Sequence, residues 1–387
     1  MNTCETCGKG FKQKSQLESH SKRKRPCKKE DDVTIRRLNY IGSKFQLLDW
    51  ISDSIKAATG WSTFEGRRIA DLFAGTGAVS HYFRKCKAVV TANDAELYSS
   101  VITRAFTCSV LTPACERFIS EVATEIAEGA HSDTVGFITD KYSPHGAADR
   151  KFFTVENARR IDYIRRRIEE QTELAENEHA FLLASLLTSA DAVSNVPAVY
   201  GCYLQDFKDK AMKPLVLEPV HTSTELPVDG SRVYCSDVLS PTFLESIDAD
   251  AVYLDPPYNH RQYSKNYFPL NMIALTPEQQ GLEDPLKGKT GIPTSCFISP
   301  FCSKSGVSDA FDTLIRGITA PWVFLSYSSD GIITRDAMVA LMGKYGTVSV
   351  VERDYKRFKS YEYNQTVPLK EFLFCLERHD LKVLGEH

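Results

Sequence analysis

Residues 68–77 read Arg-Ile-Ala-Asp-Leu-Phe-Ala-Gly-Thr-Gly, an apolar run that ends in a glycine-rich turn. Apolar residues at helical spacing follow this turn. A second apolar run at 88–92 is closed by Asp94, and similar runs occur at 249–254 and 322–327. Buried strands followed by helices predict a mostly parallel α/β sheet with both faces covered. The ligand of such a sheet binds at the carboxyl ends of its strands.

The glycine turn and Asp94 indicate a nucleotide-like ligand. Gly75 and Gly77 lack a Cβ, so that a ligand can come close to the backbone at these positions. Asp94 ends the next predicted strand, from where its carboxylate can accept both hydroxyls of a ribose. Many nucleotide-binding sheets share a glycine pair with a distal acid, so this pattern defines a class of ligand and not one reaction.

The tetrapeptide Asp255-Pro256-Pro257-Tyr258 directly follows the strand predicted at 249–254 and is more specific. Two successive prolines fix the backbone and remove two donors, so that carbonyl oxygens point outward beside a carboxylate and an aromatic ring. Such a set of acceptors with a stacking face suits the exocyclic amino group of a flat base. The alternative is an ordinary strand-ending turn, which two prolines also favour.

Taken together, residues 36–376 resemble an N6-adenine-specific DNA methyltransferase of the adenine methylase type. The segments 39–44, 71–77, 235–239 and 255–258 carry the resemblance. It implies a Rossmann-like sheet that uses S-adenosylmethionine as methyl donor and double-stranded DNA as partner. The resemblance assigns cofactor contacts to Tyr40, Lys44, Asp71, Phe73, Gly75, Gly77, Asp94, Asp237 and Asp255.

The same resemblance makes Asp255, Pro256, Pro257 and Tyr258 the catalytic set. We expect Asp255 and the carbonyl of Pro256 to accept hydrogen bonds from the adenine amino group, whose nitrogen is otherwise a poor nucleophile. The target base must leave the stacked duplex to be reached, and Tyr258 is its expected stacking partner. Lys44 is expected to close over the cofactor, and the alternative is a solvated lysine at a helix start.

The resemblance and the residue pattern divide the chain into five parts. These are a zinc finger (1–28), a linker (29–36), the cofactor half of the core (37–105), a mainly helical target-recognition insert (106–229) and the catalytic half of the core (230–387).

An arginine-rich helix is predicted in the insert from 155 to about 172. We favour contact of this region with DNA, with Arg150 and Arg159 as candidate residues, while the alternative is a solvated face with pairs such as Arg165–Glu169. An apolar helix at 180–193 is expected to pack on the sheet, and 276–305 is expected to form a mobile loop near the catalytic tetrapeptide.

The first 30 residues carry a net charge of +6 in a chain whose net charge is −3, so a basic head precedes an acidic body. Cys4, Cys7, His20 and Cys27 have a spacing that can close a tetrahedral zinc site. The segment resembles a single DNA-binding zinc finger, from which it departs at Cys27, and the alternative is a disordered basic tail. Residues expected to contact phosphates in this head are Lys12, Lys14, Arg23 and Arg25.

The 387 residues are 42% hydrophobic and 25% charged, which is typical of globular proteins and excludes disordered and collagen-like chains. No run approaches the roughly 20 apolar residues that span a bilayer. Eleven cysteines, an odd number, favour a reducing compartment. We therefore expect a cytoplasmic protein without a membrane partner, associated with the nucleoid if bacterial; the sequence leaves the oligomeric state open.

The leading hypothesis is a site-specific DNA adenine-N6 methyltransferase of a restriction–modification system, or a solitary methylase. Two alternatives stay open. One is methylation of adenine in RNA, because the same tetrapeptide serves amino groups on more than one nucleic acid. The other is a non-catalytic DNA-binding protein that depends on the zinc finger, against which the complete tetrapeptide and glycine turn speak.

Overall fold

A seven-stranded sheet forms the centre of the protein, shown by a computed structural model that describes residues 2–3, 10–11, 16, 18, 33–282, 285–355 and 369–379. The strand order is β5-β4-β3-β6-β7-β9-β8. The strands are β3 (Arg68–Asp71), β4 (Val89–Asp94), β5 (Arg232–Cys235), β6 (Ala251–Leu254), β7 (Trp322–Ser328), β8 (Gly346–Tyr355) and β9 (Leu369–Arg378). The first five run parallel, and β9 lies antiparallel between β7 and β8. The predicted mostly parallel sheet is confirmed.

The order of the strands creates a crevice at the end of β3. The chain moves outward from β3 through β4 to β5, and then returns to the other side of β3 to form β6 and β7. Helices that follow β3 and β6 therefore leave in opposite directions, and a crevice opens between them at the carboxyl ends of the strands. The glycine turn follows β3 and the catalytic tetrapeptide follows β6, so this topology brings the two motifs together.

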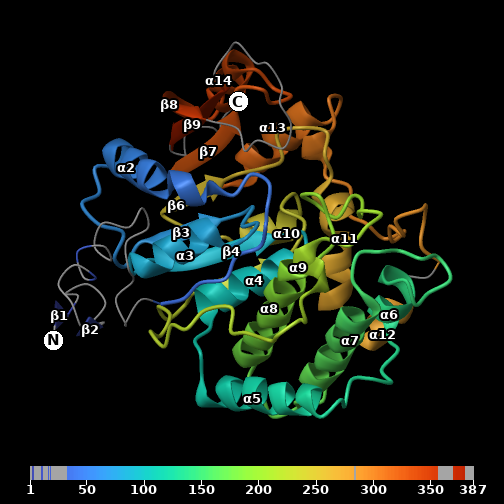
Figure 1. The fold of residues 1–387 in the computed structure, drawn as a ribbon. Helices are drawn as coiled ribbons and strands as arrows, with labels where there is room; N and C mark the ends of the chain where they lie inside the picture. Colours follow the sequence, from blue (N-terminus) through green and yellow to red (C-terminus); the bar gives the residue numbers. More distant parts are fainter. Residues whose placement is uncertain are drawn as a thin grey trace.

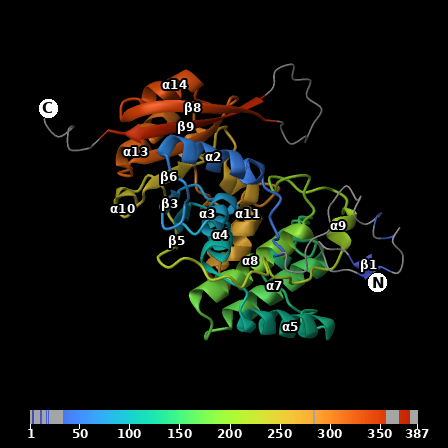
Figure 2. The same cartoon turned by 90° about the vertical axis from the view of Figure 1, so that its left-hand side faces the viewer.

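Helices cover both faces of the sheet (Figure 1). The helices of the core are η1 (Lys44–Leu47), α2 (Leu48–Thr59), α3 (Ala78–Lys85), α4 (Leu97–Cys108), α10 (Pro241–Glu245), α13 (Val307–Gly317) and α14 (Arg335–Met342). Apolar residues of α2 and α3 pack on one face of the sheet, and those of α10, α13 and α14 pack on the other. Figure 2 shows α2 and α14 on opposite sides of the β8–β9 pair.

The region between β4 and β5 is helical, as predicted. It contains α5 (Pro113–Ala127), α6 (Phe137–Tyr142), α7 (Val155–Glu169), α8 (Glu176–Ala192) and the short α9 (Asp209–Met212). We expected the apolar helix α8 to pack on the sheet, but its main neighbour is α4. Because α4 already packs against β4 and β5, α8 lies in a further layer outside it.

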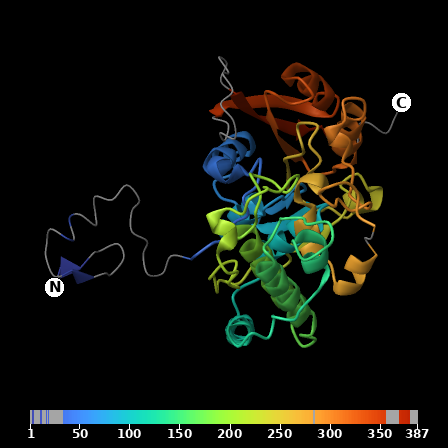
Figure 3. The ribbon, with the colours of Figure 1, turned by 45° about the vertical axis from the view of Figure 1, so that its right-hand side comes forward.

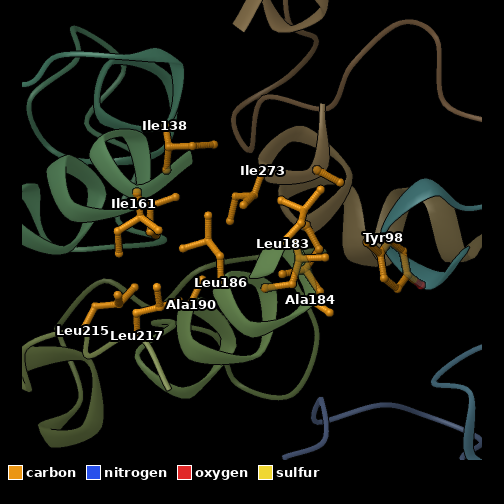
Figure 4. Packing of buried hydrophobic residues seen from close by; sticks show 14 of the residues in the cluster. Tyr98, Ile138, Ile161, Leu183, Ala184, Leu186, Ala190, Leu215, Leu217 and Ile273 are labelled. Atoms are coloured by element: carbon orange, nitrogen blue, oxygen red, sulfur yellow. The ribbon is translucent and has the colours of Figure 1, made fainter. Parts of the chain in front are cut away.

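The helical layer also takes in residues that follow the catalytic tetrapeptide. Helix α11 (Tyr263–Ala274) contributes Ile273 to a cluster of buried residues with Leu183, Leu186 and Ile161 (Figure 4). The remaining elements are α12 (Pro277–Gly281), η2 (Pro300–Cys302) and a separate antiparallel pair of β1 (Asn2–Thr3) and β2 (Gly10–Phe11). Within the described part of the chain, no helix has the length and apolar character needed to cross a membrane.

Candidate active site

A cavity of about 970 Å³, counted with the open space at its mouth, lies at the carboxyl ends of β3, β4, β5 and β6. Most of the residues predicted to act in catalysis or to bind the cofactor come together here. Those that line the cavity are Tyr40, Lys44, Phe73, Gly75, Asp94, Asp237, Asp255, Pro256, Pro257 and Tyr258.

The glycine turn after β3 brings backbone to the surface of the cavity. Gly75 has φ of +55°, and a Cβ added there would come within 3.2 Å of the Tyr40 ring. Its N–H donates a hydrogen bond of 2.8 Å to Oδ2 of Asp94. A residue with a side chain would be strained at this φ and would push against Tyr40, so the position requires glycine.

Asp71 and Gly77 lie outside the lining of the cavity, although the resemblance assigned cofactor contacts to both. Asp71 is buried and accepts a 2.6 Å hydrogen bond from Oγ of Ser80 in α3, and burial raises its pKa to about 7. Gly77 has φ of +70° and faces the backbone of Thr103 in α4, where a Cβ would lie 3.1 Å from Cα. Both residues therefore stabilise the conformation of the glycine turn through contacts with α3 and α4.

Two acids follow β4. Asp94 accepts hydrogen bonds from the N–H groups of Gly75 and Glu96, and burial raises the pKa of its carboxyl above the ordinary value. Asp94 lines the cavity, where its carboxylate can face a ligand hydroxyl. Glu96 also lines the cavity and is bonded to the amide of Asn271 in α11 at 2.6 Å. Burial raises the pKa of Glu96 to about 8.

Lys44 is joined to the first residue of the catalytic tetrapeptide. Its Nζ lies 2.8 Å from Oδ1 of Asp255 and 3.2 Å from Oε1 of Glu371 in β9. Only 6% of its side chain is exposed, so the alternative of a solvated lysine is wrong. Burial alone would lower the pKa of Lys44, but the two carboxylates hold it well above its ordinary value.

The pKa of Asp255 reflects two opposing effects. Burial raises it, and the positive charge of Lys44 pulls it back, so that it stands at about 6. The carboxyl is therefore mostly ionised at neutral pH. An ionised carboxylate accepts hydrogen bonds only, which is the role that the sequence assigned to this residue.

Aromatic rings close the cavity on the side of Tyr40. The ring of Tyr40 stacks on Tyr267 with a centroid distance of 4.8 Å and lies 5.4 Å from the ring of Tyr263. The hydroxyl of Tyr267 accepts a hydrogen bond from the N–H of Ile41 at 2.9 Å. These contacts fix the segment that leads into η1, whose first residue is Lys44, against α11. Tyr258 stands at the other side, partly exposed, with its ring edge-on to Tyr327.

Three residues that line or support the site were missed in the sequence. Glu371 begins an apolar strand, and a glutamate that enters a buried strand needs a partner, which is a signal that was available. Glu96 stands only two residues after Asp94. Gln262, in the extension of the tetrapeptide, also lines the cavity.

Several arginines of α7 are bonded within the protein, and the contact of this region with DNA stays a prediction. Arg165 is buried, bonds to backbone carbonyls near the end of α11 and forms the anticipated pair with Glu169 at 2.8 Å. Arg167 pairs with Glu125 of α5 at 2.8 Å. These two guanidinium groups therefore hold helices together.

The two insert arginines chosen as DNA contacts are held in the same way. Arg150 donates to the carbonyls of Lys289 and Lys141, each at 3.1 Å, and Arg159 donates to the carbonyl of Ser132. Part of the hydrogen-bonding capacity of both arginines is therefore used by backbone carbonyls of the protein itself. The insert thus offers less free positive charge than its sequence suggests.

All residues of the predicted zinc site and its phosphate contacts lie outside the residues that the structure describes. They are Cys4, Cys7, His20, Cys27, Lys12, Lys14, Arg23 and Arg25. Within the described ranges, no group of three or more His, Cys, Asp or Glu side chains is placed to hold a metal ion.

The chemistry of the cavity fits S-adenosylmethionine. A nucleoside part needs acceptors for ribose hydroxyls and apolar walls for a base, and Asp94, Asp237 and Phe73 supply these at the ends of β4, β5 and β3. Close approach of a ligand to backbone is possible at Gly75 because a Cβ is absent there. Fold and site together define a mixed α/β enzyme whose cofactor binds at the strand ends.

Comparison with known proteins assigns the family. Residues 40–341 match the D12 class of N6 adenine-specific DNA methyltransferases, and this match spans most of the chain. The protein belongs to this family.

Two relatives share nearly their whole length with this chain. The type II methyltransferase M.CviAII of Paramecium bursaria Chlorella virus 1 is 39% identical over 88% of this chain and 98% of its own. M.NlaIII of Neisseria lactamica is 36% identical over 88% of this chain and 99% of its own. A solved methyltransferase from Agrobacterium tumefaciens aligns with a TM-score of 0.31 and 10% identity, covering 88% of this chain and 64% of that one, which is too weak to bear on the fold.

Proposed function

We propose that this protein transfers the methyl group of S-adenosylmethionine to the N6 amino group of an adenine in duplex DNA, at a specific site. The relatives named above are type II methyltransferases, which favours a role in restriction–modification over that of a solitary methylase. The observation that carries the proposal is the pairing of Asp255 with buried Lys44 at 2.8 Å, beside Pro256 and Tyr258 in the wall of the cavity.

The amino nitrogen of adenine is a poor nucleophile because its lone pair is delocalised into the ring. Hydrogen bonds to Asp255 and to the carbonyl of Pro256 draw its two protons toward fixed acceptors and localise the lone pair toward the methyl group. Lys44 keeps Asp255 ionised in a buried position, where the carboxyl would otherwise hold a proton. Asp255 is then an acceptor that orients the amino group and stabilises the positive charge that develops on its nitrogen. It also accepts the proton that this nitrogen loses once the new bond to the methyl group has formed.

S-adenosylmethionine, when bound, supplies a methyl group already activated by the sulfonium. The task of the chain is to hold donor and acceptor in line and to keep water out. Asp94 and Asp237 are assigned to the nucleoside part, and Tyr40 with Tyr263 covers the side from which water would enter. The target base has to leave the stacked duplex, and the partly exposed ring of Tyr258 is assigned to receive it.

Incubation with S-adenosylmethionine labelled in the methyl group tests this function. Purified protein is given duplex DNA or structured RNA, and the product is digested to nucleosides and identified. We expect label in N6-methyladenine from DNA. Label from RNA alone would support the RNA alternative, and tight DNA binding without label would support a non-catalytic protein. Asp255→Ala should abolish transfer while cofactor binding persists.

We infer a zinc finger at 1–28 from the spacing of Cys4, Cys7, His20 and Cys27 alone. A segment of this size buries too little surface to fold without a metal, so zinc would supply its folding free energy. Elemental analysis of the whole protein should find about one zinc per chain. A Cys4→Ser, Cys7→Ser variant should lose it, whereas Cys202→Ser, at an exposed free cysteine, should keep it. Wild-type protein without metal would end this proposal.

A further inference from the structure

Two segments of the chain, residues 258–265 and 297–304, are bonded to each other along one edge of the cavity; we call them the rim (Figure 3, where the segment after α12 is orange). The amide of Gln262 makes two hydrogen bonds to the backbone of Ser299, one donated at 3.1 Å and one accepted at 2.9 Å. Oγ of Ser264 donates to the carbonyl of Phe297 at 2.6 Å. The second rim segment belongs to the stretch expected to be a mobile loop, but these bonds fix it to the catalytic segment.

One large apolar side chain stands exposed on this fixed rim. Ile298 has 56% of its surface exposed, while its neighbours Phe297 and Ser299 both line the cavity. The backbone of each neighbour is bonded to the first rim segment, so Ile298 is held in place at both sides. Single exposed apolar residues are common on protein surfaces. Ile298 differs in its place, between two residues that line the cavity and are held by hydrogen bonds.

Three basic side chains flank Ile298 in the same two segments. Arg261, Lys265 and Lys304 are exposed, and none of them forms an ion pair with an acid of the described residues. They differ in this from Arg165 and Arg167 of α7, whose charges are compensated within the protein. The rim therefore combines an apolar projection with uncompensated positive charge, directly at the mouth of the cavity.

We propose that the rim is the surface that receives the target duplex, with Ile298 entering the base stack in the space that the extruded adenine leaves. Arg261, Lys265 and Lys304 then contact the phosphates on either side. This inference rests on the proposed function, because it presupposes an adenine that leaves the helix. It assigns the duplex to a surface of the catalytic half in addition to the insert.

The chemistry of duplex DNA matches the rim in two respects. Its phosphates attract uncompensated lysine and arginine without regard to sequence. Removal of one base from the stack exposes the faces of its neighbours, and proteins that distort DNA fill such gaps with apolar side chains. A wedge must be rigid to oppose the return of the base, and the bonds around Gln262 and Ser299 provide that rigidity before DNA arrives.

The test compares Ile298→Ala with Val351→Ala, a truncation of another exposed apolar residue, located on β8. Methyl transfer is measured in single turnover on two duplexes, one with a paired target adenine and one in which this adenine faces an abasic site. An adenine without a partner is extruded at lower cost. We expect Ile298→Ala to be about tenfold slower or more on the paired duplex and close to wild type on the abasic one. Val351→Ala should equal wild type on both.

The proposed role of Ile298 would be refuted if Ile298→Ala and wild type had equal rates on the paired duplex. It would also be refuted if Ile298→Ala lowered the rate by the same factor on both duplexes. If wild type itself methylates neither duplex, the proposed function fails, and the two failures are thus distinguished.

For the phosphate contacts, a plot of log affinity against log salt for DNA should become shallower by roughly 0.9 in Lys265→Gln. An unchanged slope in Lys265→Gln, Arg261→Gln and Lys304→Gln alike would remove these residues from the interface.

Discussion

Lys44 holds Asp255 by an ion pair of 2.8 Å in a place where only 6% of the lysine side chain and 18% of the aspartate side chain are exposed. A carboxylate is costly to bury without a partner, so the lysine determines in which protonation state Asp255 stands. Glu371 competes for the same ammonium at 3.2 Å. The ammonium of Lys44 is thus paired with two carboxylates. The interactions among Lys44, Glu371 and Asp255 set the pKa of Asp255.

Lys44→Met removes the positive charge and should raise the pKa of Asp255 above its present value of about 6, since burial and Glu371 then act unopposed. A shift of about 1–3 pH units is expected for the loss of an adjacent charge. The rate of methyl transfer requires the ionised carboxyl, so its acid limb should move to higher pH and activity at pH 7 should fall strongly. A pH profile of single-turnover rates from pH 5 to 9 measures this.

Glu371→Gln should act with the opposite sign. The negative charge of Glu371 raises the pKa of Asp255, and its removal leaves Lys44 to Asp255 alone. The acid limb of the rate profile should therefore move to lower pH, while the rate at pH 8 stays near that of wild type. If both substitutions lowered the rate equally at every pH, the triad would have a structural role only, and its electrostatic role would be refuted.

Gly75→Ala should weaken binding of S-adenosylmethionine by about tenfold or more, because the new Cβ meets Tyr40 at 3.2 Å and disturbs the N–H that bonds to Asp94. Gly66→Ala is the matched control. Gly66 also has a left-handed φ of +72°, but a Cβ there has open space around it. Both variants should lose about 1–2 kcal/mol of stability from the backbone conformation, and calorimetric titration should find the loss of affinity only in Gly75→Ala.

The sequence predicted those parts of the site that depend on neighbouring residues. The glycine turn, Asp94 and the tetrapeptide each follow an apolar run, and a parallel sheet brings such strand ends to one edge. The pairing of Lys44 with Asp255 and Glu371 could not be predicted in this way, because the partners are far apart in the chain. The position of Glu371 depends on the antiparallel insertion of β9 between β7 and β8.

The arginines of α7 show more clearly that contacts between distant parts of the chain cannot be predicted from local spacing. Five arginines on one helix suggest a basic surface, and local spacing reveals three acidic partners for them, Glu156, Glu169 and Glu170; Glu169 is the partner of Arg165. The other acceptors of Arg165 are carbonyls of Ile273, Ala274 and Leu275, which lie more than a hundred residues away. Basic residues in a sequence therefore indicate where DNA could be contacted. The fold decides which of these residues are paired within the protein and which remain available to DNA.

Arg165 and Arg166 are neighbours on α7 with different surroundings, and they allow a direct test. Arg165 is 3% exposed and satisfies three backbone carbonyls at the end of α11, whereas Arg166 is 53% exposed and lies 3.7 Å from Glu170. Arg165→Ala leaves those carbonyls without donors and should reduce the free energy of unfolding by roughly 2–4 kcal/mol. Arg166→Ala should change it by less than about 0.5 kcal/mol, because exposed pairs contribute little.

Denaturant titration of both variants measures these stabilities, and DNA affinity is measured at a temperature where both are folded. We expect folded Arg165→Ala to bind DNA as wild type does, since its guanidinium is enclosed between α7 and α11 and cannot reach a phosphate. The contrary result, wild-type stability with a clear loss of DNA affinity, would return α7 to the DNA interface. The different effects of Arg165→Ala and Arg166→Ala would then be due to contacts with the bound duplex and not to the stability of the fold.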